Sequence, residues 1–538
     1  METVPAGEER SLSAPRTAAA ETAADRLKER GERRRRHAFI LCGTVPSDFA
    51  RLPAMWSDRL STERRRRLVE RLRSVLPAPR PGSRGSKTPV RLSGPKAEPP
   101  APEQVAEELR GRPGFAWLDG AETGHRLCSR PVAVLAVRNG RASVSGPGGH
   151  ARFVAGGLNL LDAAFSAWGG AGSGAVLVGY LGYELNRELE DLPPAPPDDL
   201  GLPDLSLRLY DSALRWDGRA WTLEATDAWG GPHPAIEAER ILAAARRRPS
   251  AAAPSGSLAR GSVVSRPTRA GFEAAVERVV ERIAGGEIFQ MNLCRRLEAR
   301  LPARHLWHLY LRLRSASPAE RGAFLDLGRG RAVLSISPEV FLSVRGREAE
   351  TRPIKGTRPR GGNLREDRAL ARELLESEKD RAELTMIVDV ARNDLGRVCE
   401  TGSVRLAGHA ELMTLPTVHH TVSTVHGRLR QETSAADLLR AAFPAASITG
   451  APKIQAMAVI AAEEECRRGP AMGGLGWISL NGDLDLAVAI RTAAAAHGRV
   501  VYHAGCGIVA DSNPELELAE SAAKARAFLT ALGAVETA

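Results

Sequence analysis

Short apolar runs separated by turn-forming residues dominate the chain from residue 113 onward. Residues 115–118, 132–137 and 176–180 are such runs, and the second ends at an Asn-Gly pair typical of tight turns. We expect each run to form a β-strand. Residues 270–284 instead place apolar side chains three and four positions apart, and this period predicts an amphipathic helix.

Four further segments, rich in β-branched or other apolar residues, predict strands: residues 205–214, 333–336, 421–425 and 486–490. Helices and strands follow one another without the regular alternation of a parallel βαβ protein. The pattern therefore predicts an α+β fold with long sheets and helices packed on them.

The N-terminal part of the chain differs in composition. The first 100 residues hold 22 Lys and Arg against 12 Asp and Glu, so nearly all of the net charge of +11 lies there. Runs of four arginines and a Pro/Gly/Ser-rich stretch predict a mobile, solvated extension over residues 1–105. Nucleic-acid binding is the alternative, but we do not expect it because aromatic residues are not interleaved with the basic ones.

The rest of the chain has the composition of a globular protein in a reducing compartment. A linker at residues 245–268 separates an N-terminal region, 106–250, from a main region, 265–533. No apolar run reaches the roughly 18 residues that span a membrane, and the start lacks the apolar segment of a secretory signal. The six cysteines form no CxxC pair, which favours reduced thiols. We therefore expect a cytoplasmic protein without membrane contact.

Two predicted helices each carry a pair of acids three positions apart. Asp380 and Glu383 form one pair, and Glu517 and Glu520 form the other. This spacing places each pair on one helix face, and carboxylates converging from two helices suit a hard cation such as Mg²⁺. Taken alone, such pairs are usually solvated surface features.

A glycine-containing turn at residues 352–360 concentrates cations around Lys355. A solvated basic loop is the ordinary interpretation, whereas a lysine facing a cleft among other cations can become a nucleophile. Glu339 follows a predicted strand, where a carboxyl can act as a general acid if it is enclosed. A solvent-exposed turn glutamate is the commoner case.

Other segments have groups suited to binding an anion. Arg491 follows an apolar strand and can bind a carboxylate through two hydrogen bonds. Gly505 and Gly507 allow close approach to backbone amides, and residues 443–453 predict a turn into a helix. His420 lies beside His419 at the start of a strand, so we expect one ring to face inward and one outward.

In order and spacing, these segments resemble the chorismate-utilising enzymes, which include anthranilate, aminodeoxychorismate, isochorismate and salicylate synthases. The resemblance covers seven blocks from Gly286 to Lys524. It implies an anthranilate synthase component I-like fold, a large β-sandwich of two subdomains with helices outside. The segments 178–184 and 197–204 also resemble the N-terminal half of aminodeoxychorismate synthases.

The resemblance implies roles for individual residues. Mg²⁺ would be bound by Glu383 and Glu520, with Asp380 and Glu517 supporting through water, and would hold the ring carboxylate of chorismate. The other carboxylate of chorismate would be bound by Arg491, Lys524 and the amides near Gly505 and Gly507. Ser447 and Thr449 would line the pocket. His420 would lie beside the departing hydroxyl, and Glu339 would protonate it.

Two positions distinguish members of the family. Water-using members carry a lysine base where this chain has Gln290, so the resemblance points to ammonia as the nucleophile. Anthranilate synthases typically have alanine where this chain has Lys355, and the lysine is typical of aminodeoxychorismate synthases. There the lysine attacks C2 of the ring and expels the C4 hydroxyl, and ammonia then attacks C4.

The resemblance therefore implies aminodeoxychorismate synthase component I, working in the 4-aminobenzoate and folate pathway. Its ammonia would come from a separate glutamine amidotransferase, since we find no glutaminase motif in the chain. Two alternatives stay open: anthranilate synthase component I, and a degenerate chorismate-binding regulatory subunit. Departures from the family pattern at Ala445, Gln455, Ala471 and Trp477 affect the fine geometry expected of the site.

Overall fold

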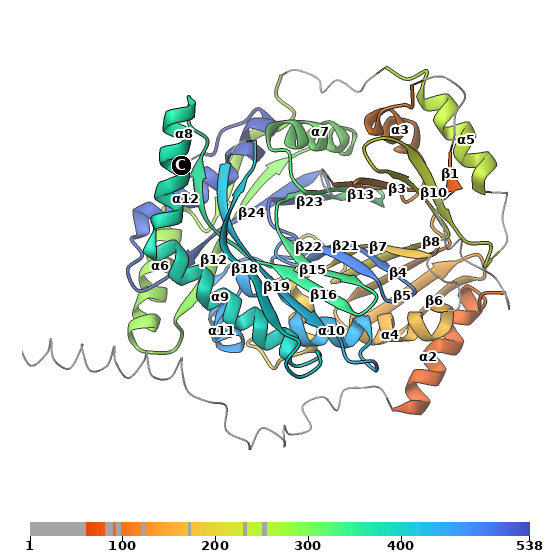
Figure 1. Cartoon of the computed structure of the whole chain (residues 1–538), viewed down its shortest axis with the longest axis horizontal. Helices are drawn as coiled ribbons and strands as arrows, with labels where there is room; N and C mark the ends of the chain where they lie inside the picture. The colour runs from red at the N-terminus through yellow and green to blue at the C-terminus, as the bar shows by residue number, and fades with distance from the viewer. Residues whose placement is uncertain are drawn as a thin grey trace, which may run out of the picture. The chain divides into compact units, whose positions relative to one another are not determined.

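The computed structural model describes residues 61–80, 90–92, 98–120, 124–169, 174–229, 234–249, 256–416 and 418–537. From Leu60 onward the chain forms one compact unit (Figure 1). Residues 1–60 of the predicted extension lie outside the described residues, as do 81–89 and 93–97. No described helix is long and apolar enough to cross a membrane.

The described strands form two antiparallel sheets. The first runs in the order β1-β10-β9-β3-β2-β13-β14-β23-β24-β12-β11, with β20 beside β12. Its strands are β1 (Val90–Arg91), β2 (Ala116–Gly120), β3 (Gly124–Cys128), β9 (Ser212–Trp216), β10 (Trp221–Ala225), β11 (Arg260–Arg266), β12 (Gln290–Arg300), β13 (Arg321–Gly328), β14 (Arg331–Ser337), β20 (Gly450–Ala451), β23 (Thr492–Ala496) and β24 (Arg499–Ile508).

The second sheet runs in the order β17-β19-β16-β15-β22-β21-β7-β8-β4-β5-β6, with β18 beside β19. Its strands are β4 (Ala133–Arg138), β5 (Arg141–Gly146), β6 (Gly149–Val154), β7 (Val176–Leu181), β8 (Leu205–Tyr210), β15 (Val340–Arg345), β16 (Glu348–Arg352), β17 (Ile354–Pro359), β18 (Arg405–Thr414), β19 (Val418–Arg428), β21 (Gly474–Ser479) and β22 (Leu484–Val488).

Helices cover the outer faces of the sheets and one end of the sandwich. In Figure 1, α3, α5 and α7 lie above the first sheet, α2, α4 and α10 lie below the second, and α6, α8, α9 and α12 gather at the left. The helices are α2 (Thr62–Val75), α3 (Pro102–Leu109), α4 (Gly157–Trp168), α5 (Pro234–Ala245), α6 (Arg269–Ala284), α7 (Leu306–Ala316), α8 (Leu364–Glu376), α9 (Glu378–Gly396), α10 (Ala435–Ala442), α11 (Lys453–Glu463) and α12 (Pro514–Leu532), with short 3-10 turns η3 (Tyr183–Glu188), η4 (Ala303–His305) and η5 (Ala446–Ile448).

The inner faces of the two sheets enclose one apolar layer. Tyr180 and Tyr210 come from the second sheet, and Ala323, Val333 and Val501 come from the first. Larger apolar clusters pack between each sheet and its outer helices. This layering confirms the predicted α+β sandwich with helices outside.

Both sheets combine strands from the two regions that the sequence separates. Residues 106–250 contribute β2, β3, β9 and β10 to the first sheet, and β4, β5, β6, β7 and β8 to the second. Residues 265–533 supply most of the remaining strands. The two regions are therefore continuous halves of each sheet.

The chain crosses between the sheets at several short links. The segment predicted as one strand at 205–214 is two, because β8 and β9 belong to different sheets and the chain turns at Asp211. Pro338–Glu339 likewise joins β14 to β15, and 489–491 joins β22 to β23. These last two crossings position candidate site residues.

The predicted extension to residue 105 is too long at its C-terminal end. Residues 62–75 form α2, which buries Leu68, Leu72 and Val75 against the core that includes α4. The arginine run lies on the exposed face of this helix, while the leucines recur four positions apart on the buried face. The indole of Trp168 donates to the carbonyl of Leu76 at 3.0 Å and fixes the end of the helix.

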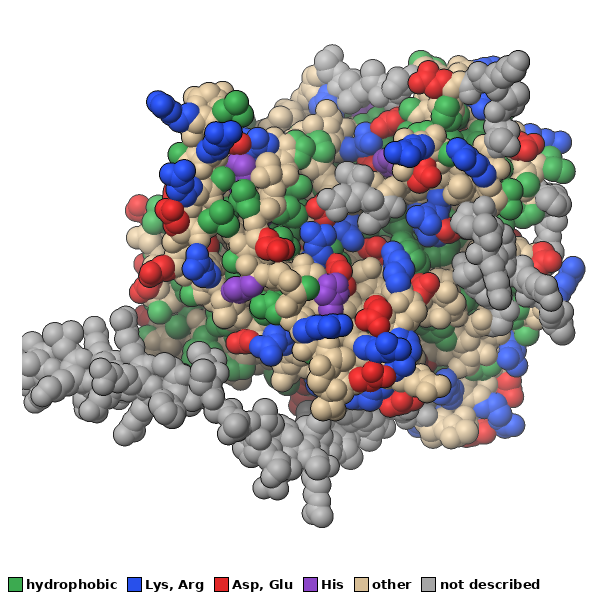
Figure 2. Space-filling view, viewed as in Figure 1, with side chains coloured by type: hydrophobic (Ala, Val, Ile, Leu, Met, Phe, Trp, Pro, Cys, Tyr) green, Lys and Arg blue, Asp and Glu red, His purple; other side chains and the backbone are tan. Residues whose placement is uncertain are grey.

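Charge on the folded unit is mixed. Figure 2 shows Lys and Arg side chains interspersed with Asp and Glu on the face in view. Beyond residue 100 the sequence carries nearly equal numbers of acids and bases. The face in view therefore shows no stripe of a single sign, the kind of surface that favours nucleic-acid binding.

We expect Leu72→Ala to destabilise the protein by about 2–4 kcal/mol, because it opens a cavity at a fully buried position. Urea unfolding followed by circular dichroism measures this change. Glu70→Ala, on the exposed face of the same helix, should stay within about 0.5 kcal/mol of the parent. Equal effects of the two substitutions would show that α2 does not pack on the core.

Candidate active site

Two chain crossings between the sheets are hydrogen-bonded to each other. The amide of Val488 donates to the carbonyl of Glu339 at 3.1 Å, and the hydroxyl of Ser337 donates to the carbonyl of Val488 at 2.6 Å. The amide of Glu339 in turn donates to the Ser337 hydroxyl at 3.2 Å. Glu339 and Arg491, one on each crossing, are thereby held at the same place between the sheets.

Glu339 is an enclosed carboxyl, with 3% of its surface exposed. Burial raises its pKa to about 7, against the opposing effects of the Ser447 hydroxyl and the Lys355 ammonium. The ordinary interpretation of an exposed turn glutamate is therefore wrong. A carboxyl with this pKa holds a proton at neutral pH and can give it up, as a general acid must.

Lys355 lies in β17 beside a β-bulge. Register with β19 shifts between Lys355 and Thr357, and Gly356 at the bulge has φ +70°. A Cβ on Gly356 would lie 2.7 Å from Leu374 and 3.2 Å from Asp380, so α8 and α9 pack directly on this glycine. Bulges change the direction of neighbouring side chains. Here the Lys355 side chain, 13% exposed, reaches the carboxylate of Glu383 with Nζ 3.9 Å from Oε2.

Gln290 and Gly507 complete the surroundings of this lysine. The amide nitrogen of Gln290 lies 3.4 Å from the same Glu383 oxygen. A Cβ on Gly507 would lie 2.5 Å from Nε2 of Gln290 and 3.0 Å from Nζ of Lys355. The glycine therefore leaves room for these side chains to converge. Oε1 of Gln290 is buried without a hydrogen-bond partner among the described residues, so one acceptor is free within the cluster.

The four predicted metal-binding acids lie at the start of α9 and α12. Burial raises the pKa of Glu383 and of Glu517, and the negative charge of Glu520 acts in the same direction on both. Carboxylate oxygens of Glu517 and Glu520 lie within 4.8 Å of each other and of the Cys506 sulfur. Asp380 is turned toward a basic side chain, since Arg358 Nη2 lies 3.2 Å from its Oδ2.

His420 is neutral and fully engaged. Burial and the nearby Arg491 lower its pKa to about 4. Its Nδ1 lies 3.0 Å from the carbonyl of Gly356 and its Nε2 lies 3.1 Å from Nη2 of Arg491. Since the carbonyl only accepts and the guanidinium only donates, the ring proton must be on Nδ1. His420 thus orients Arg491, and its placement beside a departing hydroxyl stays a prediction.

Lys524 is the third cation of the site, after Lys355 and Arg491. Its Nζ donates to the carbonyl of Gly505 at 2.8 Å and lies 2.7 Å from Oε1 of Glu520. Burial acts to lower the pKa of Lys524, but Cys506 and the Glu520 carboxylate raise it. The positive charge of Arg491 acts on Lys524 in the lowering direction, and both cations lower the pKa of His420. The site therefore combines three cations with a cluster of acids.

Two expectations need correction. Thr449 has no exposed surface, and its hydroxyl donates to the carbonyl of Ala445 at 3.1 Å within its own loop, so it shapes the loop and does not line an open pocket. His419 does not face solvent, because α8 covers that side of β19. Its Nε2 lies 2.9 Å from Asp367 and its Nδ1 3.0 Å from Thr414.

Sequence reasoning missed the partner of Asp380. Arg358 belongs to the basic turn that the sequence singled out, yet its contact with Asp380 depends on the packing of α9 against β17. An ion pair across 22 residues has no local signal. Ser447 was expected in the pocket, and it lines the same small cavity as Glu339. Its buried hydroxyl has no hydrogen-bond partner among the described residues, and its proximity acts to lower the pKa of Glu339.

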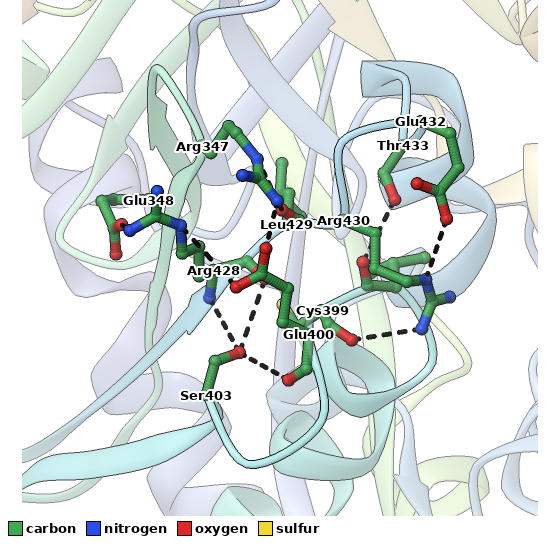
Figure 3. A network of polar contacts seen from close by, with 11 residues as sticks. Arg347, Glu348, Cys399, Glu400, Ser403, Arg428, Leu429, Arg430, Glu432 and Thr433 are labelled. Carbon is green, nitrogen blue, oxygen red and sulfur yellow. Dashed lines mark hydrogen bonds and ion pairs between the residues drawn. The ribbon is translucent and has the colours of Figure 1, made fainter.

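The far end of α9 is tied to the second sheet by a polar network (Figure 3). Nε of Arg347 donates to the carbonyl of Leu429 at 2.9 Å, and its guanidinium also binds Glu400. Nη1 of Arg430 donates to the carbonyl of Cys399 at 3.1 Å, and the amide of Glu400 donates to the carbonyl of Arg428 at 2.8 Å. This network anchors to the second sheet the segment that follows α9, the helix whose first turns carry Asp380 and Glu383.

Comparison with known proteins places this geometry in a family. The model of a chorismate binding enzyme matches residues 113–530. Anthranilate synthase component 1 of Streptomyces coelicolor is 42% identical over 67% of this chain and 73% of its own length. Aminodeoxychorismate synthase component 1 of Escherichia coli is 39% identical over 66% of this chain and 76% of its own.

A solved structure agrees. Anthranilate synthase component I from Streptococcus pneumoniae superposes with a TM-score of 0.65 at 28% identity, covering 83% of this chain and 95% of that one. The residues that the family model matches, 113–530, include every candidate site residue. Sequence and fold together show that the chain belongs to the chorismate-binding enzyme family.

Proposed function

We propose that this protein is the chorismate-aminating component of an aminodeoxychorismate synthase, converting chorismate and ammonia to 4-amino-4-deoxychorismate. The observation that carries the proposal is Lys355, whose side chain lies among Gln290, Glu383 and Gly507 in place of a solvated loop. Gln290 cannot take a proton from water, which favours ammonia as the nucleophile.

Each reacting group has a task in this chemistry. Lys355 attacks C2 of chorismate as the neutral amine, the ring double bond shifts, and the C4 hydroxyl leaves. Glu339 donates a proton so that the hydroxyl departs as water. Ammonia then attacks C4, the double bond shifts back, and the bond between C2 and Lys355 breaks with its electron pair returning to the lysine nitrogen. The new ammonium on C4 gives one proton back to the Glu339 carboxylate. Both residues thereby regain their starting forms, and the products are 4-amino-4-deoxychorismate and water.

The charged groups around these residues suit a substrate with two carboxylates. Arg491, oriented by His420, and Lys524 would bind one of them with the amides near Gly505 and Gly507. Lys524 pairs with Glu520 in this structure. If Glu520 instead binds a second cation, the Lys524 ammonium is free to bind a substrate carboxylate.

We propose Mg²⁺ as that cation. The Glu520 carboxylate lies close enough to Glu383 and Glu517 to raise the pKa of both, and carboxylates gathered in this way fit a hard cation with oxygen ligands. Glu383 and Glu520 would hold the ion, supported by Glu517 and Asp380. When bound, the ion supplies positive charge that neutralises the ring carboxylate of chorismate.

We further propose that the ammonia comes from a separate glutamine amidotransferase, in the cytoplasm. Burial raises the pKa of the thiols of Cys128 and Cys294 to about 12, and that of Cys399 to about 11. Such thiols are poor nucleophiles. Both curated relatives are also described as a first component. Use of the product in 4-aminobenzoate and folate synthesis belongs to the same proposal.

Anthranilate synthase is the second candidate, since the Streptomyces coelicolor relative has that activity in its name. The purified chain, supplied with chorismate, Mg²⁺ and an ammonium salt, should form 4-amino-4-deoxychorismate, identified by chromatography and mass spectrometry. Anthranilate as the main product would overturn the proposal.

Lys355→Ala should slow product formation by about 100-fold or more, equivalent to roughly 2.7 kcal/mol of barrier, because the covalent route is lost. Lys355→Arg keeps the charge beside Glu383 without a usable amine and should be impaired similarly. Rates are measured by chorismate consumption. An unchanged rate in Lys355→Ala would rule out the covalent role.

Activity should fall at alkaline pH if Glu339 is the acid. The carboxyl must be protonated, so kcat/KM should decrease as the pH rises above its pKa of about 7, measured at constant free ammonia. Glu339→Gln should reduce kcat/KM by about 100-fold or more, and its kcat/KM should not fall with this pKa. Glu350→Gln, on neighbouring β16, should keep the parent profile, and a decrease that persists in Glu339→Gln would assign the titration elsewhere.

Removal of either proposed metal ligand should weaken Mg²⁺ binding. We expect Glu383→Gln and Glu520→Gln to raise the Mg²⁺ concentration for half-maximal activity by about tenfold or more and to reduce the Mg²⁺-dependent rise in melting temperature. Asp389→Asn, on the outer face of α9, is the matched control. Parent-like Mg²⁺ titrations in both glutamine variants would exclude these ligands.

A further inference from the structure

One edge of β12 has a gap in its strand pairing just beyond the site. Gln290 and Met291 pair with β20, and residues 296–300 pair with β11. Among the described strands none pairs with residues 292–295 on that side, although β24 pairs along the other side. Buried backbone groups in such a gap need other partners.

The amide of Asn292 donates to the carbonyl of Thr449 at 2.8 Å, so the strand end is also bonded directly to the site loop. Two side chains bond further backbone groups in the gap. The carbonyl of Asn292 accepts from Nη2 of Arg468 at 2.7 Å, and the amide of Cys294 donates to Oε1 of Glu464 at 2.8 Å. Arg468 and Glu464 are themselves joined by two short hydrogen bonds, 2.8 Å from Nε and 2.6 Å from Nη2. The ion pair thus takes the place of a neighbouring strand between β20 and β11.

The same guanidinium also holds the loop that carries Ser447. Nη1 of Arg468 donates to the carbonyl of Ile448 at 2.8 Å, between Ser447 and Thr449. The guanidinium lies 4.4 Å from the ring centre of Tyr183, and 2% of Arg468 is exposed. One buried side chain therefore bonds the strand that begins with Gln290 and the loop whose hydroxyl acts on Glu339.

We propose that Arg468, oriented by Glu464, is a positioning residue of this active site, fixing the strand end with Gln290 against the loop with Ser447. It touches neither the substrate nor the reacting atoms. Displacing reacting groups by about 1 Å can cost about 100-fold in rate, so a fixed spacing matters. The inference rests on a chorismate-converting activity, whichever product the site releases.

The test compares variants by chorismate consumption with Mg²⁺ and ammonium. Replacing both partners, Arg468→Met with Glu464→Leu, leaves no unpaired buried charge. We expect kcat to fall about 30- to 100-fold with KM changed less than about threefold, since Arg491 and Lys524 are untouched. Arg468→Lys should retain an intermediate kcat. The pH above which kcat/KM falls should also be higher than in the parent, because a displaced Ser447 no longer acts to lower the pKa of Glu339.

A matched control lies on the same strand. Arg296 is 1% exposed and makes two hydrogen bonds of 2.8 Å to the carboxylate of Asp199, outside the proposed site. Arg296→Met should lower the melting temperature while keeping the parent kcat per folded molecule and the parent pH profile. If its kinetic losses match those of the double variant, or if the double variant keeps kcat within twofold, the proposal is overturned.

Failure of the proposed function is distinguishable from failure of this inference. If the parent protein makes anthranilate, the proposed function is wrong, but the comparison of kcat between the parent and the Arg468 and Glu464 variants still tests the positioning role. If the parent converts no chorismate, a crystal structure of the double variant decides: residues 445–449 displaced from the strand end support the positioning role, and an unmoved loop contradicts it.

Discussion

The hydrogen bonds between two chain crossings are the constraint on which the site depends. Ser337 and Val488 join the link from β14 to β15 with the link from β22 to β23, deep between the sheets. Because each link is short and both of its strands are paired, neither can shift without breaking sheet pairing. Glu339 and Arg491 therefore keep fixed positions, and the interior that encloses Glu339 is also what raises its pKa.

Most of the charged groups around the site are paired. Lys355 lies beside Glu383 and Arg358 beside Asp380, largely shielded from solvent, whereas Lys524 and Glu520 pair at the exposed rim. Arg491 lies beside neutral His420. An isolated buried charge would be costly. Under the proposed function, the two carboxylates of chorismate would take over some of these cations from the acids.

Under the proposed function, the choice between amination at C4 and the anthranilate reaction rests on Lys355 and Gln290. Relatives with either name are about equally similar to this chain, 42% and 39% identical, so overall similarity does not make that choice. Here the β-bulge at Gly356 places a lysine within a cluster that also contains Gln290.

The amino-acid pattern by itself indicated the α+β class and several of the strands, because periodicity is a local property. The sandwich and the candidate site residues came from the resemblance of ordered motifs to a known family. The pattern did not reveal that residues 62–75 belong to the core, since the arginine run masked a four-residue leucine period. Nor could it show that His419 is covered by α8, that Thr449 is turned into its loop, or that Arg468 fills a gap in β12. Lys355 changed from a cation in a turn to a partner of Glu383 only when α9 was packed against β17. Tertiary structure decided these points because contacts between distant segments, and the burial that shifts pKa values, have no local signal in the chain.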